Sequence, residues 1–199
     1  MTWKYETYDQ AFRLLNGRLK LVGTPRFNLV VCGGSALAAT GLVDRTTKDV
    51  DIVALMGDDA NLLDPAPMPE ALLQAAHEVA MDLGLPLDWL NNGPSSGDGG
   101  LFRLGLPEGF AARLAWVTIG DRLKVGFVSR YDQIHFKLFA AVDQSGSYHA
   151  EDLRALAPTD AEMIAAARWT RSHDPSAGYR LVLHRFLMEF GYGHLVDGI

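Results

Sequence analysis

A short apolar run that ends at a pair of glycines constrains the fold of this chain more than any other feature. Residues Phe27–Cys32 are apolar except for one asparagine and include adjacent valines, a composition that predicts a buried strand. Gly33 and Gly34 follow at once, and the small, alanine-rich residues 35–40 then begin a helix. The order strand, glycine turn, helix predicts an α/β protein.

The rest of the chain predicts further strands and helices around this segment. A strand is expected at 49–55, and a β-hairpin at 113–119 and 123–128. Apolar spacing predicts helices at 8–22, 69–83, 132–142, 150–156, 160–173 and 179–190. We expect a loop at 58–69, and the run NNGPSSGDGG at 91–100 is either a mobile active-site loop or, as its composition favours, a disordered excursion. The chain is therefore expected to form one domain, 1–199, with a core of about 25–156 and a helical extension over 157–199.

Length and composition exclude several classes of protein. The chain has 199 residues, of which 48% are hydrophobic and 21% are charged, fractions close to those of average globular proteins. This composition excludes a disordered, collagenous or coiled-coil protein. No apolar run approaches the roughly 20 residues that span a bilayer, and the N-terminus lacks a signal-peptide layout, so we expect a cytoplasmic protein without a membrane partner. A lone cysteine, Cys32, and the absence of zinc-ligand spacing fit a reducing compartment.

The charge of the chain limits the ways in which it could bind nucleic acid. A net charge of −6 argues against a surface that is a nucleic-acid platform as a whole, because such surfaces neutralise phosphates with Lys and Arg. Basic residues between positions 45 and 137 could still supply a local basic face, or they could be solvated charges scattered over the surface.

The glycine turn has a chemical interpretation and a structural one. Backbone N–H groups at the start of a helix favour phosphate, and Gly33, Gly34 and Ser35 would present them without bulky side chains. Glycine pairs also occur where a strand and a helix simply pack closely. The turn alone therefore leaves both interpretations open.

A second motif adds carboxylates to this turn. Asp49 and Asp51 are two positions apart in a predicted strand, so their side chains share one face and could ligate a hard divalent cation such as Mg²⁺. The alternative is an edge strand with two solvated aspartates. Apolar neighbours, Val50 and Ile52 among them, are instead typical of a buried strand, where two like charges would need a metal or a cation.

These features together resemble the active-site core of the DNA polymerase β-like nucleotidyltransferase superfamily, namely GGS at 33–35, a helix, RTTK at 45–48 and DVD at 49–51. The stretch VCGGSALAATGLVDRTTKDVDI is similar to AbiEii-type and related bacterial nucleotidyltransferases, several of which are toxins of toxin–antitoxin systems. Residues 85–91, 129–138 and 151–153 also resemble that group, which extends the resemblance over roughly 28–156.

The resemblance implies a nucleotidyltransferase fold, with a short mixed β-sheet flanked by helices and a helical C-terminal part. It implies Mg²⁺-dependent transfer of a nucleotidyl group from an NTP to a hydroxyl acceptor, on tRNA or a protein, and an antitoxin as a partner. Catalytic and metal-binding roles would fall to Asp49 and Asp51. Nucleotide binding would fall to Gly33, Gly34, Ser35, Arg45, Lys48 and Lys137. Lys137 could instead form a salt bridge with Asp152.

The chain departs from the superfamily pattern at one point. Many members use a third carboxylate on a later strand as general base, and the corresponding position here falls near Gly126. Asp88 is the candidate catalytic residue in its place, with Asp121 as a weaker one. Trp89 could stack on a nucleobase, although a tryptophan is more often part of the core. Two alternatives stay open: a catalytically degenerate nucleotide- or partner-binding protein, and a small-molecule adenylyltransferase of the aminoglycoside-modifying kind.

Overall fold

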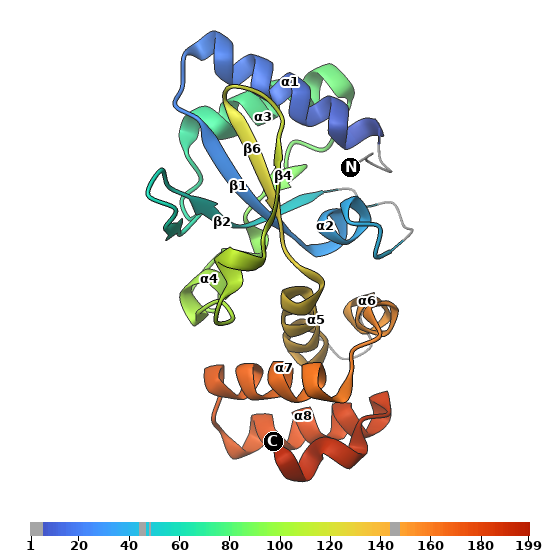
Figure 1. Cartoon of the computed structure of the whole chain (residues 1–199). Coiled ribbons are helices and arrows are strands. Elements are labelled where there is room, and N and C mark those ends of the chain that lie inside the picture. The colour runs from blue at the N-terminus through green and yellow to red at the C-terminus, as the bar shows by residue number, and fades with distance from the viewer. Residues whose placement is uncertain (1–5, 44–46, 48, 144–147) are drawn as a thin grey trace. The chain divides into compact units, whose positions relative to one another are not determined.

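The computed structural model describes residues 6–43, 47, 49–143 and 148–199 (Figure 1). The chain divides into two compact units, with the boundary between Ser129 and Arg130. None of the described helices is long and apolar enough to cross a membrane.

A mixed β-sheet forms the centre of the first unit, as predicted. Its strands among the described residues are β1 (Phe27–Cys32), β2 (Val50–Met56), β3 (Leu62–Leu63), β4 (Leu90–Asn91), β5 (Ala115–Thr118) and β6 (Leu123–Phe127). The strand order is β3-β2-β1-β6-β5, and β4 also pairs with β2. Strand β1 runs antiparallel to β2 and parallel to β6, while β5 and β6 form the expected antiparallel hairpin.

Helices α1 (Glu6–Val22) and α3 (Glu70–Leu83) pack side by side against one face of this sheet (Figure 1). Phe12, Leu15 and Leu19 lie on one side of α1 and are at most 1% exposed. Each such side chain contributes about 1.5–3 kcal/mol when it is buried. The left-handed conformation of Gly84 ends α3 at the predicted position.

The opposite face of the sheet carries the candidate site. Alternate residues of a strand face opposite sides, so Leu29 and Val31 belong to the helix-covered core, whereas Val30 and Cys32 face away from it. The short elements of the first unit are α2 (Gly33–Ala39), α4 (Leu101–Leu104) and the 3₁₀ turns η1 (Gly93–Ser95) and η2 (Phe110–Arg113).

Two predicted loops differ from the structure. The segment 58–69 contains β3, which pairs with the end of β2. The segment 91–100 is ordered, so the expected disordered excursion is wrong. Ser95 is fully buried and donates from Oγ to the carbonyl of Val53 at 2.7 Å, and Asn92 donates to the carbonyl of Pro65 at 3.0 Å. These long-range hydrogen bonds give a polar, glycine-rich segment a defined course.

The second unit, 130–199, is helical, and it includes the segment 157–199 for which a helical extension is expected. Its described elements are α5 (Arg130–Asp143), α6 (Tyr148–Leu156), α7 (Asp160–His173), α8 (Ala177–Phe190) and the 3₁₀ helix η3 (Gly193–Gly198). Helix α5 packs against both α6 and α7. A capping box starts α7, because Thr159 accepts the N–H of Glu162 while the Glu162 carboxylate accepts the N–H of Thr159.

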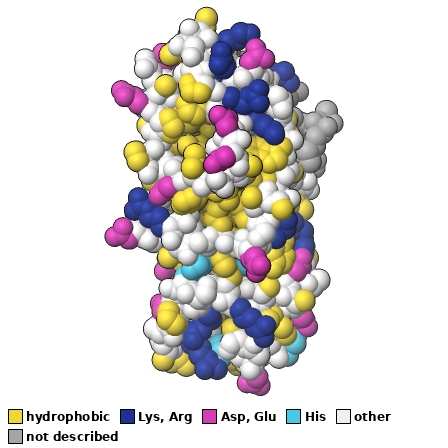
Figure 2. Space-filling view, turned by 60° about the vertical axis from the view of Figure 1, so that its left-hand side comes forward, with side chains coloured by type: hydrophobic (Ala, Val, Ile, Leu, Met, Phe, Trp, Pro, Cys, Tyr) yellow, Lys and Arg dark blue, Asp and Glu magenta, His cyan; other side chains and the backbone are white. Residues whose placement is uncertain are grey.

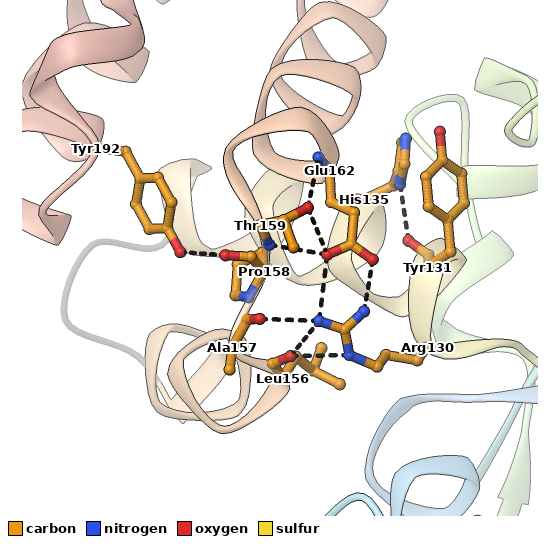
Figure 3. A network of polar contacts seen from close by, with 9 residues as sticks. All are labelled: Arg130, Tyr131, His135, Leu156, Ala157, Pro158, Thr159, Glu162 and Tyr192. Atoms are coloured by element: carbon orange, nitrogen blue, oxygen red, sulfur yellow. Dashed lines mark hydrogen bonds and ion pairs between the residues drawn. The ribbon is translucent and has the colours of Figure 1, made fainter.

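Arg130 connects the start of α5 to the α6–α7 connection (Figure 3). Its guanidinium donates to the carbonyls of Leu156 and Ala157 at 2.6–2.9 Å and pairs with the Glu162 carboxylate at 2.5 Å. The carboxylate that caps α7 is therefore also the partner of the arginine that begins α5. This pairing holds the pKa of Glu162 below its ordinary value.

Candidate functional site

The glycine turn and a carboxylate of β2 lie in contact. Gly33 has a φ of +69°, a conformation that favours glycine, and a Cβ at this position would lie 2.6 Å from Oδ2 of Asp51. The register explains this contact, because Cys32 pairs with Asp51 across the antiparallel β1–β2 ladder. Gly33 is therefore required both by the backbone conformation and by the approach of the Asp51 carboxylate.

The carboxylates are less buried than expected. Asp49 precedes β2 and is exposed, while Asp51 is half-buried within the strand. The buried neighbours that suggested a dry site, Val50 and Ile52, face the helix-covered core on the other side of the sheet. Asp49 and Asp51 thus remain accessible to a cation without the large cost of burying two like charges.

Ser35 is buried beside the turn, and its hydroxyl serves the local backbone. Its Oγ donates to the carbonyl of Cys32 at 3.3 Å, which ties the first turn of α2 to the end of β1. A small hollow next to it is lined by Tyr8, Phe12, Val31, Ser35, Ala39, Val50 and Phe127. The mainly apolar lining makes this hollow part of the packing of α1 on the sheet.

An indole covers Gly126, the position near which the resemblance predicts a third carboxylate. Gly126 pairs with Trp116 across the β5–β6 hairpin, and a Cβ on Gly126 would lie 2.9–3.0 Å from three adjacent carbons of the Trp116 ring. Three equal distances of this size mean that the ring lies face-on over the glycine. Lys124 places its Nζ 4.8 Å from the centre of the same ring. The space that a carboxylate at 126 would need is therefore filled by Trp116.

The structure places the proposed replacement bases away from this position. Asp88 is exposed in the turn before β4, and the strand partner of Asp51 on β4 is Asn91. Asn91 donates to the carbonyl of Asp88 at 3.3 Å and accepts the N–H of Gly93 at 2.7 Å. Asp121 lies at the hairpin turn beside the start of β1, and its ion pair with Lys20 at 3.0 Å holds its pKa below the ordinary value.

Trp89 belongs to the core, so the core alternative is confirmed and the stacking role is wrong. Its side chain is fully buried, donates from Nε1 to the carbonyl of Ala76 at 2.9 Å and packs edge-on against Phe12. The hydrogen bond satisfies the indole N–H inside the core and anchors the segment before β4 to α3.

Lys137 lies in the second unit, where it forms the salt bridge with Asp152. Its Nζ is 2.7 Å from Oδ2 of Asp152, and both side chains are only 5% exposed. His149 lies 3.5 Å from the ammonium, and the ring of Tyr148 lies 5.4 Å from it. The structural alternative for Lys137 is thus confirmed, and its phosphate contact stays a prediction. Arg45 and Lys48 lie outside the described residues.

Basic residues of the segment from 45 to 137 have local partners. Arg103 pairs with Asp64 at 3.1 Å, and Arg122 donates to the carbonyl of Thr24 at 2.8 Å. On the face drawn in Figure 2, Lys and Arg side chains stand among acidic and hydrophobic ones. On this face the basic side chains are therefore interspersed with other types.

Sequence reasoning missed Tyr8, Thr47 and Asn91 near the carboxylates. The hydroxyl of Tyr8 donates a hydrogen bond to the carbonyl of Thr47, and Asn91 is the strand partner of Asp51 on β4. Tyr8 lies far from the motif in the sequence, and no spacing rule connects it to Asp49. Asn91 lies within 85–91, a segment that resembles the same superfamily, but the candidate base in that segment is Asp88.

No family model matches this chain, and no curated protein or solved structure matches it significantly. Within the described part of the chain, no group of three or more His, Cys, Asp or Glu side chains is arranged to hold a metal ion. The candidate site therefore consists of the glycine turn, the pair of Asp49 and Asp51, and their neighbours.

Proposed function

We propose that this protein is a Mg²⁺-dependent nucleotidyltransferase that transfers a nucleotidyl group from an NTP to an acceptor hydroxyl. The contact between Gly33 and the Asp51 carboxylate carries the proposal. It brings the backbone of a glycine turn, which suits phosphate, against a carboxylate that suits a divalent cation. Phosphoryl transfer can use these two groups side by side, since its catalysis is mostly positioning and electrostatic stabilisation.

The residues present fit a hard cation. Asp49 and Asp51 offer carboxylate oxygens two positions apart, and their partial exposure leaves room for further ligands such as water and phosphate oxygens. When bound, Mg²⁺ would neutralise charge on the phosphates and on the developing leaving group. Asp49 and Asp51 would hold it, and the absence of a side chain at Gly33 would let a phosphate approach the same point.

The proton of the acceptor hydroxyl has no carboxylate base at position 126, where Trp116 covers Gly126. In the proposed reaction this proton passes to water or to a phosphate oxygen, which predicts slow turnover. The acceptor we favour is an RNA such as tRNA or a protein, with an antitoxin as partner, as the resemblance to toxin-like enzymes implies.

The proposal is tested by incubating the protein with each labelled NTP, Mg²⁺ and total bacterial RNA. Asp51→Asn and Asp49→Asn are the matched variants, because each removes one charge while retaining the shape of the side chain. We expect label in RNA or in the protein itself with the wild type and loss of label in both variants. Label that enters only an added aminoglycoside would assign the small-molecule reaction instead.

A second candidate is a degenerate nucleotide-binding protein. The observation that favours it is the occupation of the third-carboxylate position by Trp116. It predicts NTP binding that depends on Mg²⁺ and on Asp51, without transfer to any acceptor. Equilibrium binding of each NTP, measured on the same wild-type and Asp51→Asn preparations, separates the two candidates.

A further inference from the structure

The N-terminal helix reaches the segment that carries the candidate carboxylates. Tyr8, near the start of α1, is 9% exposed, and its hydroxyl donates to the main-chain carbonyl of Thr47. The hydroxyl of Thr47 lies 3.4 Å from the phenol oxygen and 3.1 Å from the carbonyl of Asp49, so its single proton is within reach of both. A short series of hydrogen bonds thus leads from Tyr8 through Thr47 to Asp49.

Asp49 is held on its other side by the sheet. The N–H of Val50 donates to the carbonyl of Trp89 at 2.5 Å, where β2 begins. Asp49 itself precedes the strand, and the contact between Tyr8 and Thr47 supports the main chain on its N-terminal side. The backbone of Asp49 is therefore fixed between a core tryptophan and a buried tyrosine.

The charges of both carboxylates act on the phenol of Tyr8. Burial raises the pKa of Tyr8, the hydrogen bond with Thr47 opposes this rise, and the negative charges of Asp49 and Asp51 add to it. The phenol consequently stays protonated at neutral pH and keeps its role as a hydrogen-bond donor.

We propose that Tyr8 is a positioning residue of the candidate site, which holds the main chain of Thr47 and Asp49 so that Asp49 and Asp51 present their carboxylates together to a divalent cation. This inference rests on the proposed function, because it assumes that the carboxylates bind metal. It makes α1 part of the site. Groups that orient metal ligands typically change metal affinity by about 10–100-fold when they are removed.

The test measures Mn²⁺ binding to the full-length protein by calorimetry. Tyr8→Phe keeps the ring beside Phe12 and removes the hydroxyl. Tyr192→Phe is the matched control, because it removes another tyrosine hydroxyl that donates to a backbone carbonyl, that of Pro158 at 2.6 Å, in the second unit. We expect about 10-fold weaker Mn²⁺ binding for Tyr8→Phe, unchanged binding for Tyr192→Phe and no binding for Asp51→Asn.

A second readout separates positioning from general stability. A cation on Asp49 and Asp51 would offset their charges, so adding Mg²⁺ should lower the pKa of Tyr8, seen as the difference in phenolate absorbance between the wild type and Tyr8→Phe. If Tyr8→Phe does not fold, Thr47→Val takes its place in the binding measurement, with the same expected weakening.

The two proposals fail in different ways. Wild-type protein that binds no Mn²⁺ through Asp51 overturns the proposed function and this inference with it. Wild-type binding that Tyr8→Phe, or Thr47→Val in its place, leaves unchanged overturns the role of Tyr8 alone. A Tyr8 phenol that ignores Mg²⁺ while Asp51 binds it also overturns that role.

Discussion

The indole of Trp116 covers Gly126 so closely that a Cβ on Gly126 would lie 2.9 Å from the nearest ring carbon. This contact lies on the face of the sheet that also carries Cys32 and Asp51, because Gly126 pairs with Val30, two residues before Cys32. Trp116 therefore fills the space that any side chain at position 126 would need. A carboxylate at position 126, which the proposed function would use as a general base, would have to displace this ring.

We predict that Gly126→Asp destabilises the first unit by about 1–3 kcal/mol, because the new side chain must displace the Trp116 ring. The double variant Trp116→Ala/Gly126→Asp should recover part of this loss, since the ring that causes the clash is gone. Urea unfolding of the wild type, both single variants and the double variant provides the measurement. Additive effects of the two substitutions would contradict the contact.

Gly33→Ala should impair both folding and the candidate site. The substitution forces a side chain into a conformation with φ of +69° and places a Cβ 2.6 Å from Oδ2 of Asp51. Gly23→Ala is the matched control, because Gly23 has a φ of +74° with open space around it. We expect Gly33→Ala to cost about 1–3 kcal/mol more than Gly23→Ala in unfolding free energy.

The same pair of variants tests the geometry of the carboxylate. Mn²⁺ binding should weaken in Gly33→Ala, since the Asp51 side chain must move, and it should stay unchanged in Gly23→Ala. Equal stability and equal metal affinity of the two variants would show that Asp51 does not depend on the bare turn.

The buried pair of Lys137 and Asp152 predicts a large loss of stability on breaking it. Each side chain is 5% exposed, so Lys137→Met leaves a buried carboxylate without its cation and should cost about 3–5 kcal/mol. The double variant Lys137→Met/Asp152→Leu should lose much less, because no charge remains buried. Arg185→Ala, which breaks an exposed pair with Glu189, should change the unfolding midpoint little.

These measurements also guide any activity assay on Lys137. Loss of nucleotide binding in Lys137→Met has meaning only when thermal unfolding shows a folded second unit. A variant that remains fully stable would contradict the structural role of the salt bridge.

Acid should weaken the second unit through Glu162. Its pKa is lowered by the hydrogen bond from Arg130, against the opposing effect of burial, with further lowering from Thr159. A carboxylate with a lowered folded-state pKa contributes stability that is fully present above its ordinary pKa, near 4.5, and is lost as the pH falls through the folded-state value. The difference in unfolding free energy between wild type and Glu162→Gln should therefore shrink as the pH falls from about 6 to about 3. Urea unfolding at intervals of about one pH unit measures it. A constant difference would contradict the linkage.

The sequence predicts the elements whose signal is local. Periodic apolar residues identify α1 and α3, alternation with a Gly-Asp turn identifies the β5–β6 hairpin, and the glycines after Cys32 identify the start of α2. Gly33 and Asp51 come together because the strand, helix, strand order allows β1 and β2 to pair, with Cys32 opposite Asp51. These features depend on residues that are close in the chain.

Features that depend on distant residues could not be predicted in this way. Ser95 orders the 91–100 segment through Val53, and Trp89 is buried through a carbonyl of α3. Tyr8 reaches Thr47 from outside the motif. Composition favoured disorder for 91–100, and it carries no information on the partners of Trp89 and Tyr8, which only the long-range hydrogen bonds reveal.

The central position of β1 in the sheet affects how the chain folds during synthesis. One edge of β1 pairs with β2, which follows soon in the sequence, but its other edge pairs with β6, where Asn28 lies beside Lys124. During synthesis β1 can pair early with the strand that carries Asp51, yet it keeps an open edge until β6 has emerged. An open edge of this kind invites pairing with other chains. Nascent or truncated chains that end before Leu123 should therefore aggregate, even though they contain the glycine turn and both aspartates.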